Sequence, residues 1–238
     1  MGCDRLPSST YKALGKLHNL EELHIHDDIH NCSLYIHHTE FSTLCAGLKS
    51  LRKLDIYQSR GVTDLAMASI TQLTSLEELC ISGCQITSKG LTYISAVNNL
   101  TALDISETAV HDYGISLLTK LLLLRSLVLR DCWNITGLSM SHINKLVMLD
   151  ELNVAGCPIG PQGLFRIMAL KKLSKLHCDG GLISDRSISH ISTYLPDVKE
   201  FVLTGCCAAV NDKSREYLRS VKVHHAAGMS VMVSVDMV

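Results

Sequence analysis

Three things are scarce in this 238-residue sequence: aromatic side chains, an excess of charge of either sign, and long apolar runs. Aromatic residues make up 5% of the chain against 47% apolar residues, which favours repeated thin layers of Leu, Ile, Val and Ala over one interlocked core. The 22 basic and 23 acidic residues nearly cancel, whereas a nucleic-acid-binding surface normally needs an excess of Lys and Arg. No apolar stretch approaches the ~20 residues that span a bilayer. We therefore expect neither nucleic acid nor membrane as a partner.

Signals of secretion and catalysis are also missing. Residues 1–7 contain no apolar run of the length that a secretory leader needs. The ten cysteines are therefore expected to be thiols of an intracellular, cytoplasmic protein. The sequence has no Gly-x-Ser-x-Gly, no phosphate-binding loop and no paired-cysteine motif. We expect a protein that is not an enzyme, with no catalytic residues, no cofactor and no small-molecule substrate.

What the chain does contain is an internal repeat. The pattern is Leu-x-x-Leu-x-Leu, in which Ile, Val or Cys often fills the last position and Val198 and Phe201 replace the first two leucines of the last copy. It starts at Leu20, Leu51, Leu76, Leu100, Leu124, Leu149, Leu173 and Val198. After the first step the spacing is 24 or 25 residues throughout, which matches a leucine-rich repeat of one strand and one helical return. The first step is longer and carries an insertion within residues 27–40.

This period predicts one domain over residues 1–238. Residues 1–19 are a partial first unit or an N-terminal cap, 20–220 are eight repeats, and 221–238 are a degenerate unit or C-terminal cap whose residues 229–235 could form a last edge strand. Strands are expected at 54–56 and at the matching positions of the other units. Each return helix starts near a Thr, Ser, Asp or Asn, as at Thr87. The predicted fold is an α/β solenoid, a curved horseshoe with a parallel sheet on its concave face and helices or helical turns on its convex face.

A ladder of small or hydrogen-bonding residues lies eight positions after each first leucine. The ladder consists of Asp28, Ser59, Cys84, Thr108, Cys132, Cys157, Gly181 and Cys206. At the bend after each strand such a side chain is expected to point inward and to satisfy backbone groups freed by the turn. Gly83 and Gly180-Gly181 are expected to be turn glycines.

The units 149–159 and 84–91 carry a family resemblance. Leu149-x-x-Leu152-x-Val154-x-Gly156-Cys157-x-Ile159 resembles the cysteine-containing class of leucine-rich repeats, which includes the repeats of F-box substrate receptors. The chain is also similar to the Ser-Gly-Cys repeats of trypanosome leucine-rich-repeat proteins. The resemblance covers about residues 20–220 and implies the fold. The units are slightly shorter than usual for the class, and neither an F-box segment nor a RING pattern is present.

The candidate binding residues are those that flank the inward-facing leucines of the strands. Because side chains alternate along a strand, these residues face outward in rows across the concave sheet. The predicted site is His24, His26, Lys53, Asp55, Tyr57, Glu78, Cys80, Asp104, Ser106, Val128, Arg130, Asn153, His177, Asp179, Glu200 and Val202. Trp133, the single tryptophan, is expected to pack in a turn rather than to anchor a partner.

The segment 24–38 is rich in histidine and invites a metal-site hypothesis. His24 and His26 lie two apart on a strand and share a face, which suits two zinc ligands. The spacing with His30, Cys32 and His37 matches no established zinc motif, and the alternative is a polar strand with an exposed insertion. We expect no metal site here.

Three functions are compatible with such a solenoid. The leading hypothesis is a non-enzymatic module that binds a protein partner on its concave face. The alternatives are the substrate-recognition arm of a ubiquitin ligase complex, which the family resemblance implies, and a structural subunit of a larger assembly.

Overall fold

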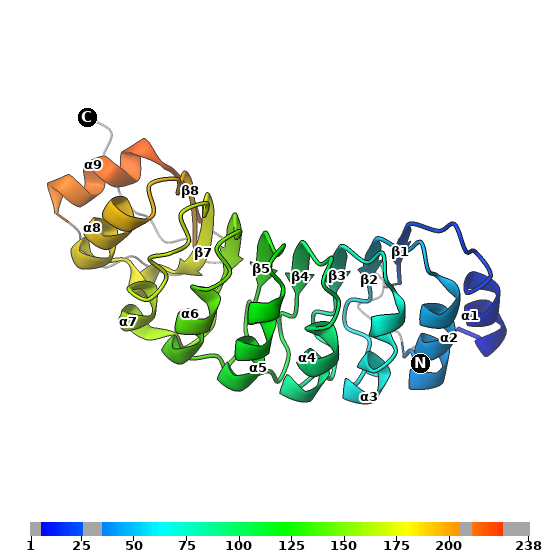
Figure 1. Cartoon of the computed structure of the whole chain (residues 1–238). Coiled ribbons are helices and arrows are strands. Elements are labelled where there is room, and N and C mark those ends of the chain that lie inside the picture. Colours follow the sequence, from blue (N-terminus) through cyan, green and yellow to red (C-terminus); the bar gives the residue numbers. More distant parts are fainter. Residues whose placement is uncertain (1–5, 26–34, 205–210, 226–238) are drawn as a thin grey trace.

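The computed structural model describes residues 6–25, 35–204 and 211–225, and its strands form one parallel sheet. The strands lie in chain order, from β1 at one end to β9 at the other (Figure 1). Their bounds are β1 Glu22–His24, β2 Lys53–Asp55, β3 Glu78–Cys80, β4 Ala102–Asp104, β5 Ser126–Val128, β6 Glu151–Asn153, β7 Lys175–Asp179, β8 Glu200–Thr204 and β9 Lys222–His225. Consecutive units are therefore neighbours in space, as the repeat predicts.

The helices lie on the opposite side of the array from the strands, so the strands line the concave side (Figure 1). The α-helices are α1 Ser8–Leu14, α2 His38–Gly47, α3 Asp64–Met67, α4 Ser88–Ile94, α5 Asp112–Leu117, α6 Gly137–Ile143, α7 Gly160–Leu164, α8 Asp185–Tyr194 and α9 Asp212–Ser220. Three 3₁₀ turns accompany them, at Ile70–Gln72, Leu118–Lys120 and Gly180–Leu182. This is the α/β leucine-rich-repeat horseshoe that the sequence predicts.

Each short strand buries its middle residue and exposes its neighbours. In β4, Leu103 is 1% exposed while Ala102 and Asp104 are partly exposed. The strand starts one residue earlier than predicted, at Ala102 rather than at Leu103, but the alternation of faces is as predicted. The same inward position is filled by Leu or Phe in every strand from β1 to β8.

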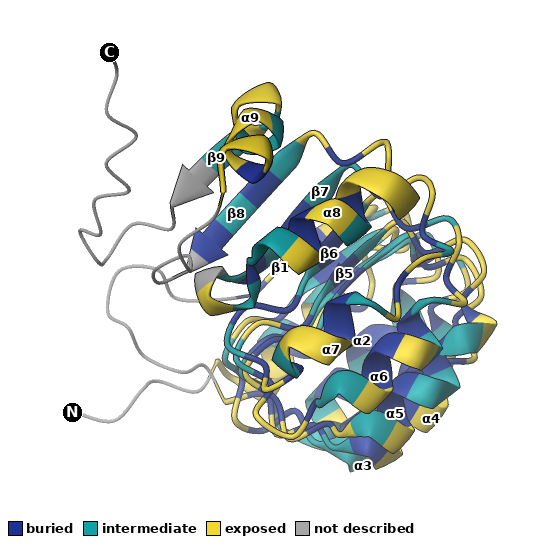
Figure 2. Cartoon of the chain, turned by 90° about the vertical axis from the view of Figure 1, so that its left-hand side faces the viewer, coloured by how far each residue is buried: buried dark blue, intermediate teal, exposed yellow. Residues whose placement is uncertain are grey.

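The core is one continuous cluster that runs from Tyr11 to Leu203. In the fourth unit Leu100, Ile105, Val110 and Ile115 are all fully buried between the strand and its return helix. Figure 2 shows the same division, with buried residues on the inner side of α4, α5 and α6 and exposed residues on the outer side. Burying one such side chain contributes about 1.5–3 kcal/mol, so the stacked layers supply the main stabilising term.

The inward-facing ladder is confirmed at five described positions, which are all buried: Ser59, Cys84, Thr108, Cys132 and Cys157. At Gly181 the prediction is wrong, because this residue is exposed in the 3₁₀ turn Gly180–Leu182. The thiols of Cys84, Cys132 and Cys157 donate to backbone carbonyl oxygens of the preceding unit, at 3.2, 3.2 and 2.9 Å. Cys157, for example, bonds to Leu129 O. Burial raises the pKa of the Cys84 and Cys157 thiols to about 12, so both remain protonated donors. Asp28 and Cys206 lie outside the described residues.

A residue with positive φ comes directly before each of five ladder positions. These residues are Gln58, Gly83, Glu107, Asp131 and Gly156, with φ between 53° and 73°. The left-handed conformation reverses the chain after the strand and turns the next side chain inward. At Gly83, φ is 69°, which confirms the predicted turn glycine.

Aspartates at helix starts tie one repeat to the next. Asp64, the first residue of α3, accepts from the Thr87 backbone N–H at 2.8 Å and from its hydroxyl at 2.6 Å. Asp112 in α5 makes the same pair of bonds to Thr136, at 2.9 and 2.7 Å. Asp185 in α8 accepts from the Asn211 N–H at 2.8 Å. These carboxylates accept hydrogen bonds from donors at the start of the following helix and interact favourably with the positive end of its dipole.

The C-terminal part differs from the predicted eight strands. A ninth strand, β9, pairs in parallel with β8, with Phe201 opposite Val223. It lies in the stretch for which the repeat pattern predicts only a degenerate unit or cap. The edge strand predicted at 229–235 and most of the insertion within 27–40 lie outside the described residues. Within the described part of the chain, no helix is long and apolar enough to cross a membrane.

Candidate binding surface

The register of the sheet aligns the outward-facing residues in two rows. The first row is Glu22, Lys53, Glu78, Ala102, Ser126, Glu151, Lys175, Glu200 and Lys222. The central row is His24, Asp55, Cys80, Asp104, Val128, Asn153, His177 and Val202. Neighbours in a row lie ~4.8 Å apart, so predicted site residues from eight repeats form one continuous surface.

Alternating charges give the first row two ion-pair ladders. Lys53 Nζ lies 3.7 Å from Glu22 and 3.2 Å from Glu78. Lys175 Nζ lies 3.6 Å from Glu151 and 3.5 Å from Glu200. Ala102 and Ser126 separate these ladders. Exposed pairs of this kind contribute little to stability, so their charges are available to a partner at small cost.

Three polar side chains of the central row accept hydrogen bonds from the backbone at the ends of their strands. Asp55, Asp104 and Asn153 each accept from the backbone N–H two residues further on, at 3.2, 2.9 and 3.1 Å. One side-chain oxygen is thereby held in place at each strand exit. Asp55 also lies 3.5 Å from His24 Nδ1. The row therefore presents fixed rather than freely rotating polar groups.

Cys80 lies in the central row between Asp55 and Asp104. Burial raises the pKa of its thiol, and the two carboxylates raise it further. A thiol held protonated is a poor nucleophile and a poor metal ligand. The outward orientation predicted for Cys80 is confirmed, and its chemistry is that of a small packing group.

His177 is a largely enclosed ionisable group of the central row. Its side chain is 17% exposed, and Nε2 lies 3.3 Å from Glu151 Oε1. Burial lowers the pKa of His177, and the Lys175 ammonium lowers it further, while Glu151 acts in the opposite direction. A neutral imidazole at this point gives the face a hydrogen-bonding group without a charge.

The sequence also predicts a third outward-facing row, formed by the residues two positions after those of the central row, and this prediction is wrong in part. Ser106 is only 4% exposed, and its counterparts Ser82 and Ala155 are equally buried. The cause is the left-handed turn that starts one residue later, since it ends the strand alternation and draws small side chains between neighbouring turns. Tyr57 and Arg130 remain exposed. Asp179 is partly exposed and accepts from the Gly156 N–H at 3.1 Å.

A hollow of about 160 Å³ lies on the concave face over β1 to β5. It exists because Ala102, Ser126 and Val128 are short, while Asp55, Glu78, Asp104, His24 and Lys53 form its rim. Its volume suits one side chain rather than a cofactor, since small-molecule pockets usually measure ~300–1,000 Å³.

The histidine-rich segment provides no described metal site. His26, His30 and Cys32 lie outside the described residues, and so does the predicted binding role of His26. His37 accepts from the Thr39 N–H at the start of α2, and His24 faces Asp55. Among the residues that the structure describes, no three His, Cys, Asp or Glu side chains come together as metal ligands.

Many exposed large apolar side chains lie outside the predicted site, and Trp133, Tyr113 and Leu138 are among the most exposed of those described. Trp133 is 76% exposed, so its predicted packing in a turn is wrong. Tyr113 and Leu138, in the first turns of α5 and α6, are 64% and 59% exposed. Tyr113 and Leu138 break the polar pattern expected of helix starts, and this is the sequence signal that points to them.

Comparisons with known proteins agree with this architecture. A family model described as "Leucine Rich repeat" matches residues 72–95 and 145–168. A protein of Trypanosoma equiperdum named "Putative adenylate cyclase regulatory protein" is 31% identical over 136 residues, which are 57% of this chain and 21% of that protein. The chain thus spans about a fifth of the length of this curated relative.

Solved structures with the same fold include two internalins of Listeria monocytogenes. One crystal structure, of an internalin F, aligns with a TM-score of 0.58 at 17% identity, over 92% of this chain and 64% of that chain. The other, of internalin C2, aligns with a TM-score of 0.51 at 19% identity, over 80% of this chain and 84% of that chain. At such identities the likeness concerns the fold alone. Together with the repeat model and the nine-stranded parallel sheet, it shows that the chain is a leucine-rich repeat protein.

Proposed function

We propose that the concave sheet binds a protein partner through the first and central rows and that the chain has no catalytic role of its own. Leucine-rich repeat domains commonly act as protein-interaction modules, and extended concave surfaces are what solenoids offer to partners. The observation that carries the proposal is the continuous, in-register surface of mixed charge with the hollow at Ala102, Ser126 and Val128.

The hollow is the expected anchor point. Its floor is small and its rim carries the Asp104 carboxylate, which has one oxygen held by the Ser106 N–H. A partner side chain that enters the hollow would be desolvated at its tip and stay near a fixed charge. Anchors of this kind, enclosed by a polar rim, carry most of the energy of many interfaces.

A regulatory form of this function is compatible with the trypanosome relative, whose printed name assigns it the regulation of an adenylate cyclase. The same concave rows would then contact the regulated protein. Because the chain matches only 21% of that relative, we limit the proposal to the binding of a protein partner.

The test is a double variant, Asp104→Lys with Val128→Lys, which fills the hollow and reverses its charge. Proteins captured by the wild-type chain are identified by mass spectrometry and then titrated directly against both forms. Affinity is expected to fall at least about tenfold. The matched control, Asp197→Lys with Leu123→Lys, makes the same change of net charge at exposed positions that do not line the hollow.

Thermal unfolding of both double variants separates binding from folding. Equal capture by the wild type and by the hollow variant would contradict the assigned surface. Equal loss in the two double variants would also contradict it, because the effect would then come from net charge alone.

A further inference from the structure

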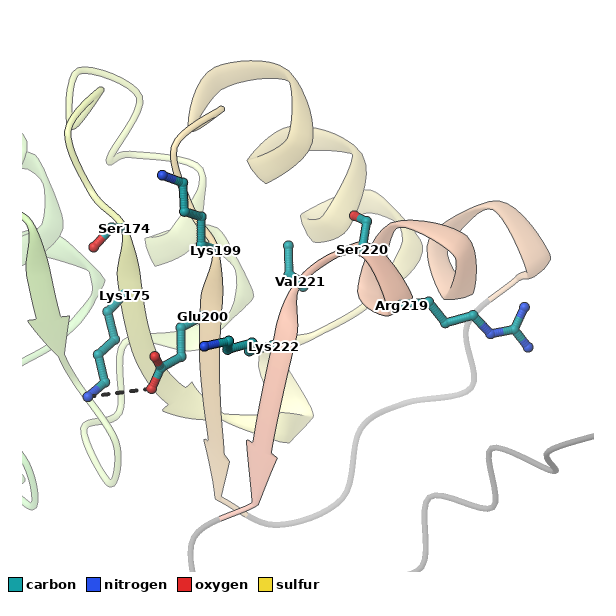
Figure 3. A pocket seen from close by; sticks show the side chains of 8 residues that line it. All are labelled: Ser174, Lys175, Lys199, Glu200, Arg219, Ser220, Val221 and Lys222. Atoms are coloured by element: carbon teal, nitrogen blue, oxygen red, sulfur yellow. Dashed lines mark ion pairs between the residues drawn. The ribbon is translucent and has the colours of Figure 1, made fainter.

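A second and larger hollow, of about 610 Å³, lies at the C-terminal end of the described sheet. It is lined by Ser174, Lys175, Lys199, Glu200, Arg219, Ser220, Val221 and Lys222. Figure 3 shows that these residues come from the beginnings of β7, β8 and β9 and from the end of α9. Lys175, Glu200 and Lys222 belong to the first row, so this hollow lies along the same row, beyond the smaller hollow over β1 to β5.

The lining is strongly basic. The lining holds four cationic side chains and one carboxylate, which gives it a formal charge of +3 (4 − 1) on a chain whose total is −1. Lys175 pairs with Glu200 at 3.5 Å and with Glu151 at 3.6 Å. Within the described residues, Lys199, Arg219 and Lys222 have no ion pair. The unpaired positive charges of the lining therefore lie at the starts of β8 and β9 and at the end of α9.

The cations do not converge on one point. In Figure 3 Lys222 points toward Glu200, whereas Lys199 and Arg219 point away from it in different directions. A single phosphate or carboxylate could not contact all of them. β7 and β9 lie about 10 Å apart, from two steps of ~4.8 Å. The pattern instead fits several anionic groups spaced along an extended ligand.

The lining contains no aromatic side chain on which a base could stack, as single-stranded nucleic acids require. The neighbouring first row also carries Glu151 and Glu200, which would repel a continuous phosphate backbone. A peptide with separated acidic side chains can avoid these two carboxylates and still reach the lysines.

We propose that this basic hollow, at residues 174–175, 199–200 and 219–222, docks an acidic segment of a partner protein. The inference rests on the proposed function in one respect: it assigns the partner's chemistry at one end of the same sheet. The partner would lie with an acidic stretch over β8 and β9 and with another part of its surface toward the hollow at Ala102.

The probe is a fluorescently labelled synthetic peptide of about twelve residues with alternating Glu and Ser, titrated against the full chain. Its counterpart has Gln in place of every Glu. We expect the acidic peptide to bind, the Gln peptide not to bind, and the affinity to fall as ionic strength rises, because exposed charges are screened. Lys199→Glu with Lys222→Glu should weaken binding about tenfold or more.

Lys89→Glu with Lys120→Glu is the matched control, since both lysines are exposed on the helical side. If the reversal variant does not fold, Lys199→Ala with Lys222→Ala replaces it. Equal binding of the Glu and Gln peptides, or an unchanged affinity in the hollow variants, would overturn the proposal. Complete competition by inorganic phosphate would indicate a site for a single anion instead. Preferential binding to phosphatidylserine vesicles would indicate a membrane-binding surface. Either result would also overturn the proposal. The peptide titration needs no natural partner. A negative result therefore refutes only the basic hollow as a docking site, and the proposed function is still tested separately by the capture experiment with the Asp104 and Val128 variant.

Discussion

Replacing Asp112 by Ala should lower the free energy of unfolding strongly, although the Asp112 side chain is partly exposed. Asp112 begins α5, and its carboxylate accepts from the Thr136 N–H at 2.9 Å, from the Thr136 hydroxyl at 2.7 Å and from the Ser139 hydroxyl. All three donors belong to the start of α6 in the next repeat. The substitution thus removes a link between two repeats rather than a contact within one.

The expected magnitude follows from these bonds. A hydrogen bond to a charged group contributes about 1.5–3 kcal/mol, and an amide left without a partner costs about 1–3 kcal/mol. Asp112 is partly exposed, so water replaces some of the loss, and the three bonds do not add fully. We expect a loss of about 2–3 kcal/mol for Asp112→Ala. Asp112→Asn keeps one acceptor oxygen and should cost about 1 kcal/mol.

The pH dependence gives an independent check. Burial by itself would raise the pKa of Asp112, but the bonds from Ser139 and Thr136 outweigh it and hold the pKa below the ordinary value of 3.8. A carboxylate with a lowered pKa stabilises the fold above its unfolded-state value, and this stability is lost as pH falls through the folded-state value. The difference between wild type and Asp112→Asn should therefore shrink in acid below about pH 4.

Urea unfolding followed by far-ultraviolet circular dichroism measures the effect. Asp150→Ala is the control, because Asp150 is exposed and its side chain makes no described bond; it should change stability by less than about 0.5 kcal/mol. If Asp112→Ala unfolds with the same midpoint and slope as Asp150→Ala, the link between repeats has no energetic role. A lower slope would indicate that the two halves now unfold separately.

Two further predictions concern other parts of the solenoid. Burial, and then the charges of Arg186 and Lys171, lower the pKa of His190 below the ordinary value of 6.5. The free energy of unfolding should therefore fall as pH drops through 6.5, and His190→Phe should reduce this loss. Unfolding measured on both sides of that pH checks this, and an unchanged pH profile in the variant would contradict the assignment. Gly114→Ala should destabilise the fold by about 1–3 kcal/mol, because a Cβ there would lie 2.5 Å from Ser88 Oγ. Ser88→Ala in the same chain should recover part of the loss. If Gly114→Ala leaves the thermal unfolding temperature unchanged, the close contact is refuted.

The outward rows are predictable from the sequence because their causes are local. A parallel strand alternates its faces, and the 24- or 25-residue period places the same position of each unit side by side. The period alone therefore assigns Asp55, Cys80 and Asp104 to one row, and the pairing register confirms this assignment.

The errors come from positions where the chain leaves the strand. Ser106 follows the alternation in sequence but is buried, because the chain turns at Glu107, where φ is 55°, and the serine side chain is short enough to lie within the turn. Tyr57 and Arg130 also precede a residue with positive φ, but their long side chains remain exposed. A non-glycine residue with positive φ has no clear sequence signature. The prediction for Trp133 fails for a similar reason, since the exposure of its side chain depends on how far the turn projects from its neighbours.

The sequence by itself determined the period, the inward-facing leucines, the cysteine ladder and the order of the strands, because each repeat has one apolar face that only its neighbours can cover. Only the tertiary structure decided which polar groups meet across repeats. The contact of Asp112 with Thr136 joins residues 24 apart, and the hollow beside Lys199 and Lys222 needs a ninth strand and the end of α9. Such contacts depend on how neighbouring units are displaced and turned relative to each other, which is a property of the stacked array and not of any one repeat.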